Sequence, residues 1–293
     1  MDLEFLLGIR KLLTADGAMG TALTERGLPA GATAALWNVE RPADVAEVHR
    51  GHLRSGAECI LTNTFGGNAV ALAAHGAAGR TEELNRAAVE VARKAAGGRA
   101  LVVGDMGPTG ALVAPYGDLS VADAREAFRQ QASALAQAGV DALLYETFQS
   151  AGELRLALEA ANACCDLPLI ACMTFAPEPS GRYRSMMGDG PQDLVRIAEE
   201  CGCAVIGTNC GQGIQTMPAL VAELAGLTDR PILVKPNAGL PQLVGGRTVY
   251  REDPEVFRRC VPLVYEAGAR IIGGCDGTTA EHVRVIREFA DTL

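Results

Sequence analysis

Eight short apolar runs follow one another along the chain, and each run ends in a polar or glycine-rich cluster. Each run contains four to six β-branched or aliphatic residues before the polar break. Uninterrupted apolar runs of this length are typical of strands that are buried on both faces of a parallel sheet. We therefore predict eight strands, within residues 12–20, 59–67, 100–108, 142–148, 167–175, 204–213, 231–240 and 270–278.

Stretches rich in Ala, Leu, Glu and Arg with helical spacing separate these runs. Thr81, followed by two glutamates, and Ser120, with Asp123 three residues further on, are predicted helix starts. A strand and a helix repeated eight times predict a single (β/α)8 TIM barrel over residues 1–293. An open doubly wound sheet is the alternative, but eight comparable units fill the chain and leave no second domain. The clearest helical stretches lie at residues 43–57, 81–96, 121–138 and 253–267.

The composition is that of a globular protein, with 48% hydrophobic and 21% charged residues. The net charge of −9 has the wrong sign for a protein that binds nucleic acid or an anionic membrane. No apolar run approaches the roughly 18 residues of a membrane-spanning helix, and the first residues do not resemble an export signal. Nine cysteines, an odd number, in a chain without an export signal favour reduced thiols and a cytoplasmic location.

Unusual polar residues and thiols gather at the carboxyl ends of the predicted strands. In a barrel these ends converge on one face, where the connecting loops build the active site. The longer predicted non-helical loops, at residues 20–42, 105–119 and 176–190, lie on this face as well. A single Asp or Asn after a strand is equally well explained by a turn, whereas the whole set favours a site. Its members are Asp16, Asn63, Asp105, Glu146, Asn209, Cys210, Asn237, Cys275 and Asp276.

Cys210 and Cys275 end the sixth and eighth predicted strands, and Asp276 follows directly. Two thiolates and a carboxylate form a ligand set that suits zinc with one coordination position open. An open position would let zinc bind an incoming thiol, lower its pKa and present it as a thiolate nucleophile. The alternative is that both cysteines are buried small hydrophobic residues, because no local C-x-x-C pair supports a metal. The other seven cysteines are predicted to be packing residues, with the pairs at 164–165 and 201–203 on the opposite face of the barrel.

Other candidate motifs are weaker. His49 and His52 share one side of a predicted helix, but no carboxylate or thiol with metal-ligand spacing joins them, so we interpret them as part of a solvated face. The glycine-rich stretches lack the P-loop lysine and the complete G-x-G-x-x-G pattern, which disfavours nucleotide binding. No G-x-S-x-G motif supplies a serine nucleophile. A metal-free lyase with Asp16 and Glu146 as acid and base has only these two residues in its favour.

Eight short motifs at the predicted strand ends resemble, in the same order, those of the homocysteine S-methyltransferase family, in particular the homocysteine-binding barrel of cobalamin-dependent methionine synthases. The resemblance covers essentially the whole chain. It implies a TIM barrel in which zinc bound by three cysteines activates the sulfur of homocysteine for attack on a methyl group carried by cobalamin, a betaine or a sulfonium. The motifs are DGAMGT (16–21), TNTF (62–65), GPTG (107–110), ETF (146–148), MTF (173–175), GTNCG (207–211), PNAGLP (236–241) and GGCDGTT (273–279).

The resemblance implies the metal ligands residue by residue. Cys210 in GTNCG and Cys275 in GGCDGTT take the positions of two zinc-binding, catalytic cysteines. Asp276 replaces the third cysteine of the family, so the ligand set loses one soft donor. Three outcomes are open: a functional Cys2Asp zinc site, a weakened or empty site, or a relative adapted to another acceptor or metal.

The resemblance also implies how an amino-acid substrate is held. Asp16 and Glu146 are expected to receive its ammonium group, and backbone N–H groups near Phe65 and Gly66 its carboxylate. Asn237 is expected to approach the metal or the substrate. The folate, cobalamin and activation modules of a methionine synthase do not fit within 293 residues. The expected methyl donor is therefore a small methyl compound or a separate corrinoid protein.

The resulting hypothesis is a cytoplasmic zinc enzyme that catalyses a methyl transfer involving a thiol, in which homocysteine is converted to methionine. The alternative is a non-catalytic or altered-acceptor relative that binds an amino acid or a corrinoid partner, because Asp276 stands at a zinc-ligand position.

Overall fold

The computed structural model describes residues 2–245 and 247–293. Eight parallel strands form one sheet in the order β1-β12-β9-β8-β5-β4-β3-β2. A parallel bridge between Ala15 and Cys59 joins the two ends of this order, so the sheet closes into the predicted barrel. The strands are β1 (Leu13–Thr14), β2 (Cys59–Leu61), β3 (Leu101–Met106), β4 (Ala142–Phe148), β5 (Leu169–Met173), β8 (Val205–Gly213), β9 (Ile232–Asn237) and β12 (Ala269–Ile272).

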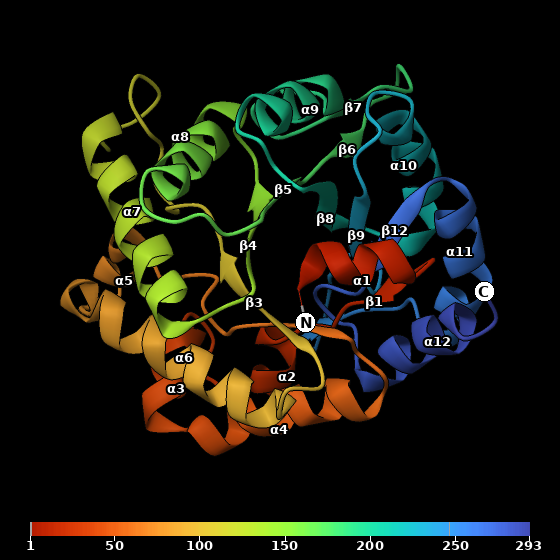
Figure 1. The fold of residues 1–293 in the computed structure, drawn as a ribbon, viewed down its shortest axis with the longest axis horizontal. Helices are drawn as coiled ribbons and strands as arrows, with labels where there is room; N and C mark the ends of the chain where they lie inside the picture. The colour runs from red at the N-terminus through yellow and green to blue at the C-terminus, as the bar shows by residue number, and fades with distance from the viewer. Residues whose placement is uncertain (1, 246) are drawn as a thin grey trace.

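A ring of helices surrounds the barrel (Figure 1). The four helical stretches predicted from the sequence are all present, with ends shifted by three residues or fewer. Ser120 caps its helix as predicted, by accepting a hydrogen bond from the N–H of Asp123. Thr81 begins a helix, but its hydroxyl donates to the carbonyl of Ala78 and does not cap. The main helices are α4 (Pro42–Arg54), α6 (Thr81–Ala96), α7 (Val121–Ala138), α8 (Ala151–Asn162), α9 (Pro191–Glu200), α10 (Met217–Ala225), α11 (Pro254–Glu266) and α12 (Ala280–Ala290).

Two apolar layers hold the barrel together. One fills its interior with inward-pointing side chains of the strands, and Leu3 and Leu6 of helix α1 (Leu3–Ile9) belong to this layer. Helix α1 therefore closes the amino-terminal end of the barrel, across which it lies in Figure 1. The larger layer lies between the strands and the helix ring. Because the amino-terminal end is closed, the carboxyl ends of the strands form the open face.

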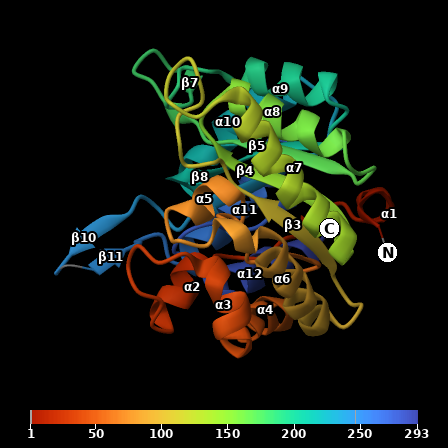
Figure 2. The same cartoon turned by 90° about the vertical axis from the view of Figure 1, so that its left-hand side faces the viewer.

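The loops on the open face contain more regular structure than the sequence predicts. Residues 20–42, expected to be non-helical, include α2 (Gly20–Glu25), η1 (Ala34–Leu36) and α3 (Trp37–Glu40). Short antiparallel hairpins follow β5 and β9, and the second projects from the molecule in Figure 2. These elements are too short to give a periodic signal in the sequence. The remaining ones are α5 (Ala69–Ala73), η2 (Ala78–Arg80), β6 (Ala176–Pro177), β7 (Tyr183–Arg184), η3 (Ile214–Thr216), β10 (Gln242–Val244) and β11 (Arg247–Val249).

The interpretation of His49 and His52 as part of a solvated face is wrong. Both side chains are buried, on the side of α4 that also carries Val45 and Val48. Nε2 of His52 lies 3.1 Å from the position that a Cβ on Gly17 would occupy. Burial lowers the pKa of His49 to about 4 and also lowers the pKa of His52, so both imidazoles are neutral at pH 7.

All nine cysteines are free thiols. The pairs at 164–165 and 201–203 follow α8 and α9 and pack against the core, at the end of the barrel away from the open face. Among residues 2–245 and 247–293, no helix has the length and apolar character needed to span a bilayer.

Candidate active site

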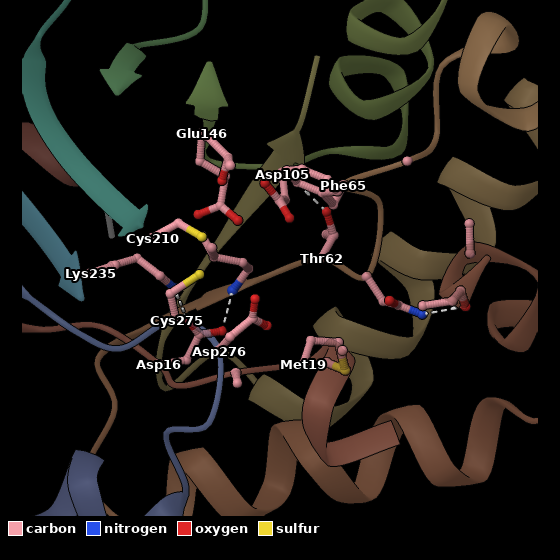
Figure 3. A pocket seen from close by; sticks show the side chains of 18 of the residues that line it. Asp16, Met19, Thr62, Phe65, Asp105, Glu146, Cys210, Lys235, Cys275 and Asp276 are labelled. Carbon is pink, nitrogen blue, oxygen red and sulfur yellow. Dashed lines mark hydrogen bonds and ion pairs between the residues drawn. The ribbon is translucent and has the colours of Figure 1, made fainter. Parts of the chain in front are cut away.

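A cavity of about 490 Å³ opens at the carboxyl ends of the strands. Most of the predicted site residues line it, although they come from six different strand ends. Asn209 and Asn237 are the exceptions, because they lie behind the lining residues. Figure 3 shows the charged side chains and the two thiols pointing into the same space. The lining residues foreseen from the sequence are Asp16, Asn63, Phe65, Gly66, Asp105, Glu146, Cys210, Cys275 and Asp276.

Cys210, Cys275 and Asp276 form a cluster with the geometry of a metal site. Their two sulfur atoms and one carboxylate oxygen all lie within 4.8 Å of one another, and all three side chains are half-buried. A hydrogen bond between the two sulfurs lowers the pKa of Cys210. The same hydrogen bond, together with burial, raises the pKa of Cys275. Burial raises the pKa of Asp276, so this carboxylate is destabilised without a cation beside it.

The backbone at Cys210 is held in an unusual conformation. Cys210 has a φ of 60°, in the left-handed region that side chains other than glycine rarely adopt, and Thr147 has a φ of 63°. Asn209 connects the two strand ends: its Oδ1 accepts from the N–H of Thr147 at 2.7 Å, and its Nδ2 donates to the Thr147 hydroxyl at 2.7 Å. The buried Asn209 amide therefore fixes Cys210 on β8 relative to Glu146 on β4.

The loop that carries Cys275 and Asp276 is fixed by hydrogen bonds to two neighbouring strand ends. The N–H of Cys275 donates to the carbonyl of Pro236 at 2.7 Å, and the N–H of Ala238 donates to the carbonyl of Asp276 at 2.8 Å. The N–H of Gly274 donates to the carbonyl of Asp16 at 2.8 Å. These hydrogen bonds use only main-chain atoms of the loop. The loop conformation therefore does not require a cysteine at position 276.

Asn237 lies beneath the thiol pair. Its side chain is 3% exposed, and its amide forms a hydrogen bond to Cys210 that helps to lower the pKa of that thiol. Asn237 is thus positioned to stabilise the thiolate form of Cys210, whereas it does not line the cavity.

Asp16 and Lys235 form a buried ion pair in the cavity floor. Nζ of Lys235 lies 2.6 Å from Oδ1 of Asp16, and each side chain is 3% exposed. The second oxygen of Asp16 accepts the N–H of Leu61 at 2.8 Å. Burial lowers the pKa of Lys235, but the charges of Asp16 and Glu146 outweigh it and raise the pKa above its ordinary value. Lys235 is therefore a permanent ammonium, and both oxygens of Asp16 have partners within the chain.

Glu146 and Asp105 are the less compensated acids of the cavity. Burial raises the pKa of Glu146 to about 7. Burial and then the charge of Glu146 raise the pKa of Asp105 well above its ordinary value. Carboxylates with raised pKa values in a concave site are typical of functional groups that await a cation or a proton.

Phe65 and Gly66 lie at the edge of the cavity. The Phe65 ring is 42% exposed and covers Gly107, where a Cβ would lie 2.5 Å from the ring. Among the described residues, the N–H groups of Phe65 and Gly66 make no hydrogen bond, so they are available to an anion.

Lys235 and Tyr250 are among the residues near the site that were not predicted from the sequence. Lys235 is the polar break in the apolar run of β9, so its position at a strand end was the signal that could have identified it. Tyr250 packs against Gly277, and burial together with the charge of Asp276 raises the pKa of its hydroxyl to about 12. Tyr250 follows the hairpin β10–β11, and no local pattern indicates that it returns to the thiol cluster.

A closed eight-stranded barrel with a two-thiol, one-carboxylate cluster at its open face defines a barrel enzyme with a candidate metal centre. The family model described as homocysteine S-methyltransferase matches residues 13–290. The chain belongs to the homocysteine S-methyltransferase family, a family of methyltransferases. The resemblance inferred from the strand-end motifs is therefore confirmed.

The similar proteins agree with this assignment. Methionine synthase of Mycobacterium tuberculosis is 30% identical over 297 aligned positions, which cover 94% of this chain and 24% of that protein. The methionine synthase of Mycobacterium leprae is 29% identical with the same coverage. The chain thus spans about a quarter of the length of these relatives.

Among solved structures, the metallated form of the homocysteine methyltransferase MmuM from Escherichia coli is 28% identical, with a TM-score of 0.80 and coverage of 98% of this chain and 99% of that chain. A methyltransferase from Methanosarcina mazei, 14% identical with a TM-score of 0.61 and coverage of 99% and 97%, shares the fold.

Proposed function

We propose that this protein methylates the thiol of homocysteine to form methionine, at a zinc ion held by Cys210, Cys275 and Asp276. The observation that supports the proposal is the cluster of two sulfurs and one oxygen within 4.8 Å, at the open face of a barrel that belongs to the homocysteine S-methyltransferase family. The structurally similar MmuM is described as a homocysteine methyltransferase with a metallated form.

The residues fit a zinc ion by their chemistry. Zinc accepts both thiolate and carboxylate ligands, and three protein ligands leave a fourth position for a substrate. The raised pKa of the buried Asp276 carboxyl also favours a cation beside it. When bound, zinc supplies a Lewis acid that favours the thiolate form of the acceptor at neutral pH.

The chain's own residues bind and orient the acceptor in this proposal. Glu146 provides the negative charge for the substrate ammonium, and Asp16, whose charge is compensated by Lys235, lines the same cavity. The free N–H groups of Phe65 and Gly66 bind the carboxylate. The neighbouring thiol of Cys275 and, to a smaller extent, Asn237 lower the pKa of Cys210, which favours the thiolate form of this ligand.

The methyl donor is proposed to be either a small methyl compound or a methylated corrinoid on a separate protein. A donor panel distinguishes them: purified protein, zinc and homocysteine are incubated with S-methylmethionine, glycine betaine or a methylated corrinoid protein, and methionine is quantified. Methionine formed with one donor class identifies the donor. No methionine with any donor, although homocysteine binds, would contradict catalysis and support the non-catalytic alternative, which the aspartate at position 276 favours.

The metal assignment is tested by zinc stoichiometry in the wild type, in Cys210→Ser and in Cys203→Ser. Cys203 is a matched control, because it is a buried thiol packed in the core at the other end of the barrel. We expect one zinc per chain in the wild type and in Cys203→Ser, and its loss in Cys210→Ser. Equal zinc content in all three proteins would contradict the assignment.

A further inference from the structure

Asp105 and Glu146 line the cavity, and each has a fully buried carboxylate oxygen, Oδ1 and Oε2 respectively, with no hydrogen-bond partner among the described residues. Both side chains are more than nine-tenths buried, with exposed fractions of 6% and 7%. Asp105 on β3 pairs in register with Leu144 on β4, two residues before Glu146. Side chains two residues apart on a strand share a face, and Figure 3 shows both carboxylates pointing into the same cavity.

Asp16 differs from these two acids because its charge is already compensated. Lys235 donates to one of its oxygens at 2.6 Å, and the N–H of Leu61 donates to the other at 2.8 Å. A cation that enters the cavity therefore finds its unsatisfied acceptors at Asp105 and Glu146. Leaving buried acceptors without donors costs free energy, and a ligand that supplies the donors recovers it.

The main chain of Asp105 is rigidly held. Its N–H donates to the hydroxyl of Thr62 at 3.0 Å, and its carbonyl accepts from the hydroxyl of Thr64 at 2.7 Å. The two hydroxyls lie 2.6 Å apart, and the buried Gln131 amide donates to the carbonyl of Thr64 at 2.7 Å. The threonines of the TNTF motif thus fix the direction of the Asp105 side chain before a ligand arrives, which lowers the entropy lost on binding.

We propose that Asp105 is a substrate-positioning residue that, with Glu146, binds the α-ammonium group of the amino-acid thiol. This inference rests on the proposed function and names a contact that the family motifs do not supply. A primary ammonium carries three N–H donors, enough for one hydrogen bond to each of the two carboxylates. A sulfonium centre or a quaternary ammonium has no N–H and would leave the oxygens unsatisfied. The burial that raises the pKa of both acids is relieved by the same ammonium.

The test compares two thiols by isothermal titration calorimetry on the zinc-loaded protein: L-homocysteine and 4-sulfanylbutanoate, which is the same thiol acid without the amino group. The zinc and carboxylate contacts are the same for both, so their affinity ratio reports the ammonium contact. We expect Asp105→Asn to weaken homocysteine binding by roughly tenfold to a hundredfold, the range of a charge-assisted hydrogen bond. Binding of the amino-free thiol should change by less than about twofold.

Asp118→Asn is the matched control, because it makes the same chemical change on an exposed residue of the loop that follows β3. It should leave both affinities unchanged. Thermal unfolding of each variant checks that the fold is intact. We expect Asp105→Asn to fold, because Asn has the size of Asp and Oδ1 of Asp105 has no hydrogen bond that the substitution would break.

Two results would overturn the role of Asp105 while leaving the proposed methyl transfer standing. One is an unchanged affinity ratio in Asp105→Asn, and the other is an equal weakening of both thiols. Equal binding of both thiols by the wild type would show that the ammonium is not recognised at all. If neither thiol binds the wild type, both the inference and the proposed acceptor are wrong.

Discussion

Replacing Lys235 by methionine should destabilise the protein strongly, although the two side chains have similar length. The substitution leaves Asp16 buried at 3% exposure without its cation. At 2.6 Å and an effective dielectric constant of about 20, the attraction within the pair is about 6 kcal/mol, most of which offsets the desolvation of the two ions. Removing one partner of a buried pair costs about 3–5 kcal/mol, because the desolvation of the remaining ion is no longer offset.

The expected loss is therefore about 3–5 kcal/mol in the free energy of unfolding of Lys235→Met at pH 8, measured by urea denaturation of the zinc-free protein. Asp16→Asn should cost less, because Lys235 keeps the attraction of Glu146. The double variant Asp16→Asn/Lys235→Met should cost less than the sum of the two single changes, with a coupling of about 2 kcal/mol or more. Lys94→Met, on the exposed side of α6, is the control and should change stability by less than about 0.5 kcal/mol.

The cost of Lys235→Met should also shrink at pH 5. Glu146, with a pKa of about 7, is then neutral and no longer adds a second stranded charge. A loss below about 1 kcal/mol at pH 8, the range of an exposed ion pair, would refute the reasoning. Strict additivity of the two single variants would refute it as well.

Three further predictions concern Glu146, Asp276 and Asn209. In the zinc-free protein, burial raises the pKa of Glu146 from 4.5 to about 7, so folding favours its protonated form. Stability should therefore fall by about 3 kcal/mol as the pH rises from about 4.5 to about 7. Glu146→Gln should flatten this dependence in urea denaturation at pH 5 and 8, and an unaltered pH profile would contradict the assignment. Asp276→Cys should tighten zinc binding by about tenfold or more, because a thiolate is the softer ligand, and Asp276→Ala should weaken zinc binding. Chelator competition measures these affinities. Equal affinities in the wild type and both variants would mean that Asp276 is not a ligand. Asn209→Ala should lower the free energy of unfolding by about 1–3 kcal/mol, because Thr147 loses two part-buried hydrogen bonds. A change below about 0.5 kcal/mol would argue against this link.

The fold and the position of the site could be predicted because both depend on local features. Each strand of the barrel is buried on both faces and therefore appears as an unbroken apolar run, and the polar residue that ends the run lies at the open face. Cys210, Glu146 and Asp105 were located in this way. The burial of His49 and His52 could also have been recognised. Val45 and Val48 give α4 an apolar face at the i, i+3, i+4 and i+7 spacing, and the two histidines complete it.

The charge pairing within the site could not be predicted, because it depends on contacts between distant parts of the chain. Lys235 pairs with Asp16, 219 residues away, and nothing local to either residue indicates the other. The same holds for Asn209 and Thr147, which are 62 residues apart. Resemblance to a family places residues at motif positions, but it does not reveal which carboxylates are already neutralised. Only the three-dimensional structure distinguishes the compensated Asp16 from the unpartnered oxygens of Asp105 and Glu146.

The aspartate at position 276 has a different meaning once the structure is considered. Its loop is held by main-chain hydrogen bonds, so the change from cysteine does not displace the ligand position, and the carboxylate oxygen stays within 4.8 Å of both sulfurs. A carboxylate and a thiolate carry the same charge, so the net charge of the ligand set is also unaltered. What changes is the softness of one donor. For the zinc site that we propose, the difference from a three-cysteine site is therefore one of degree in metal affinity and in the reactivity of the bound thiol.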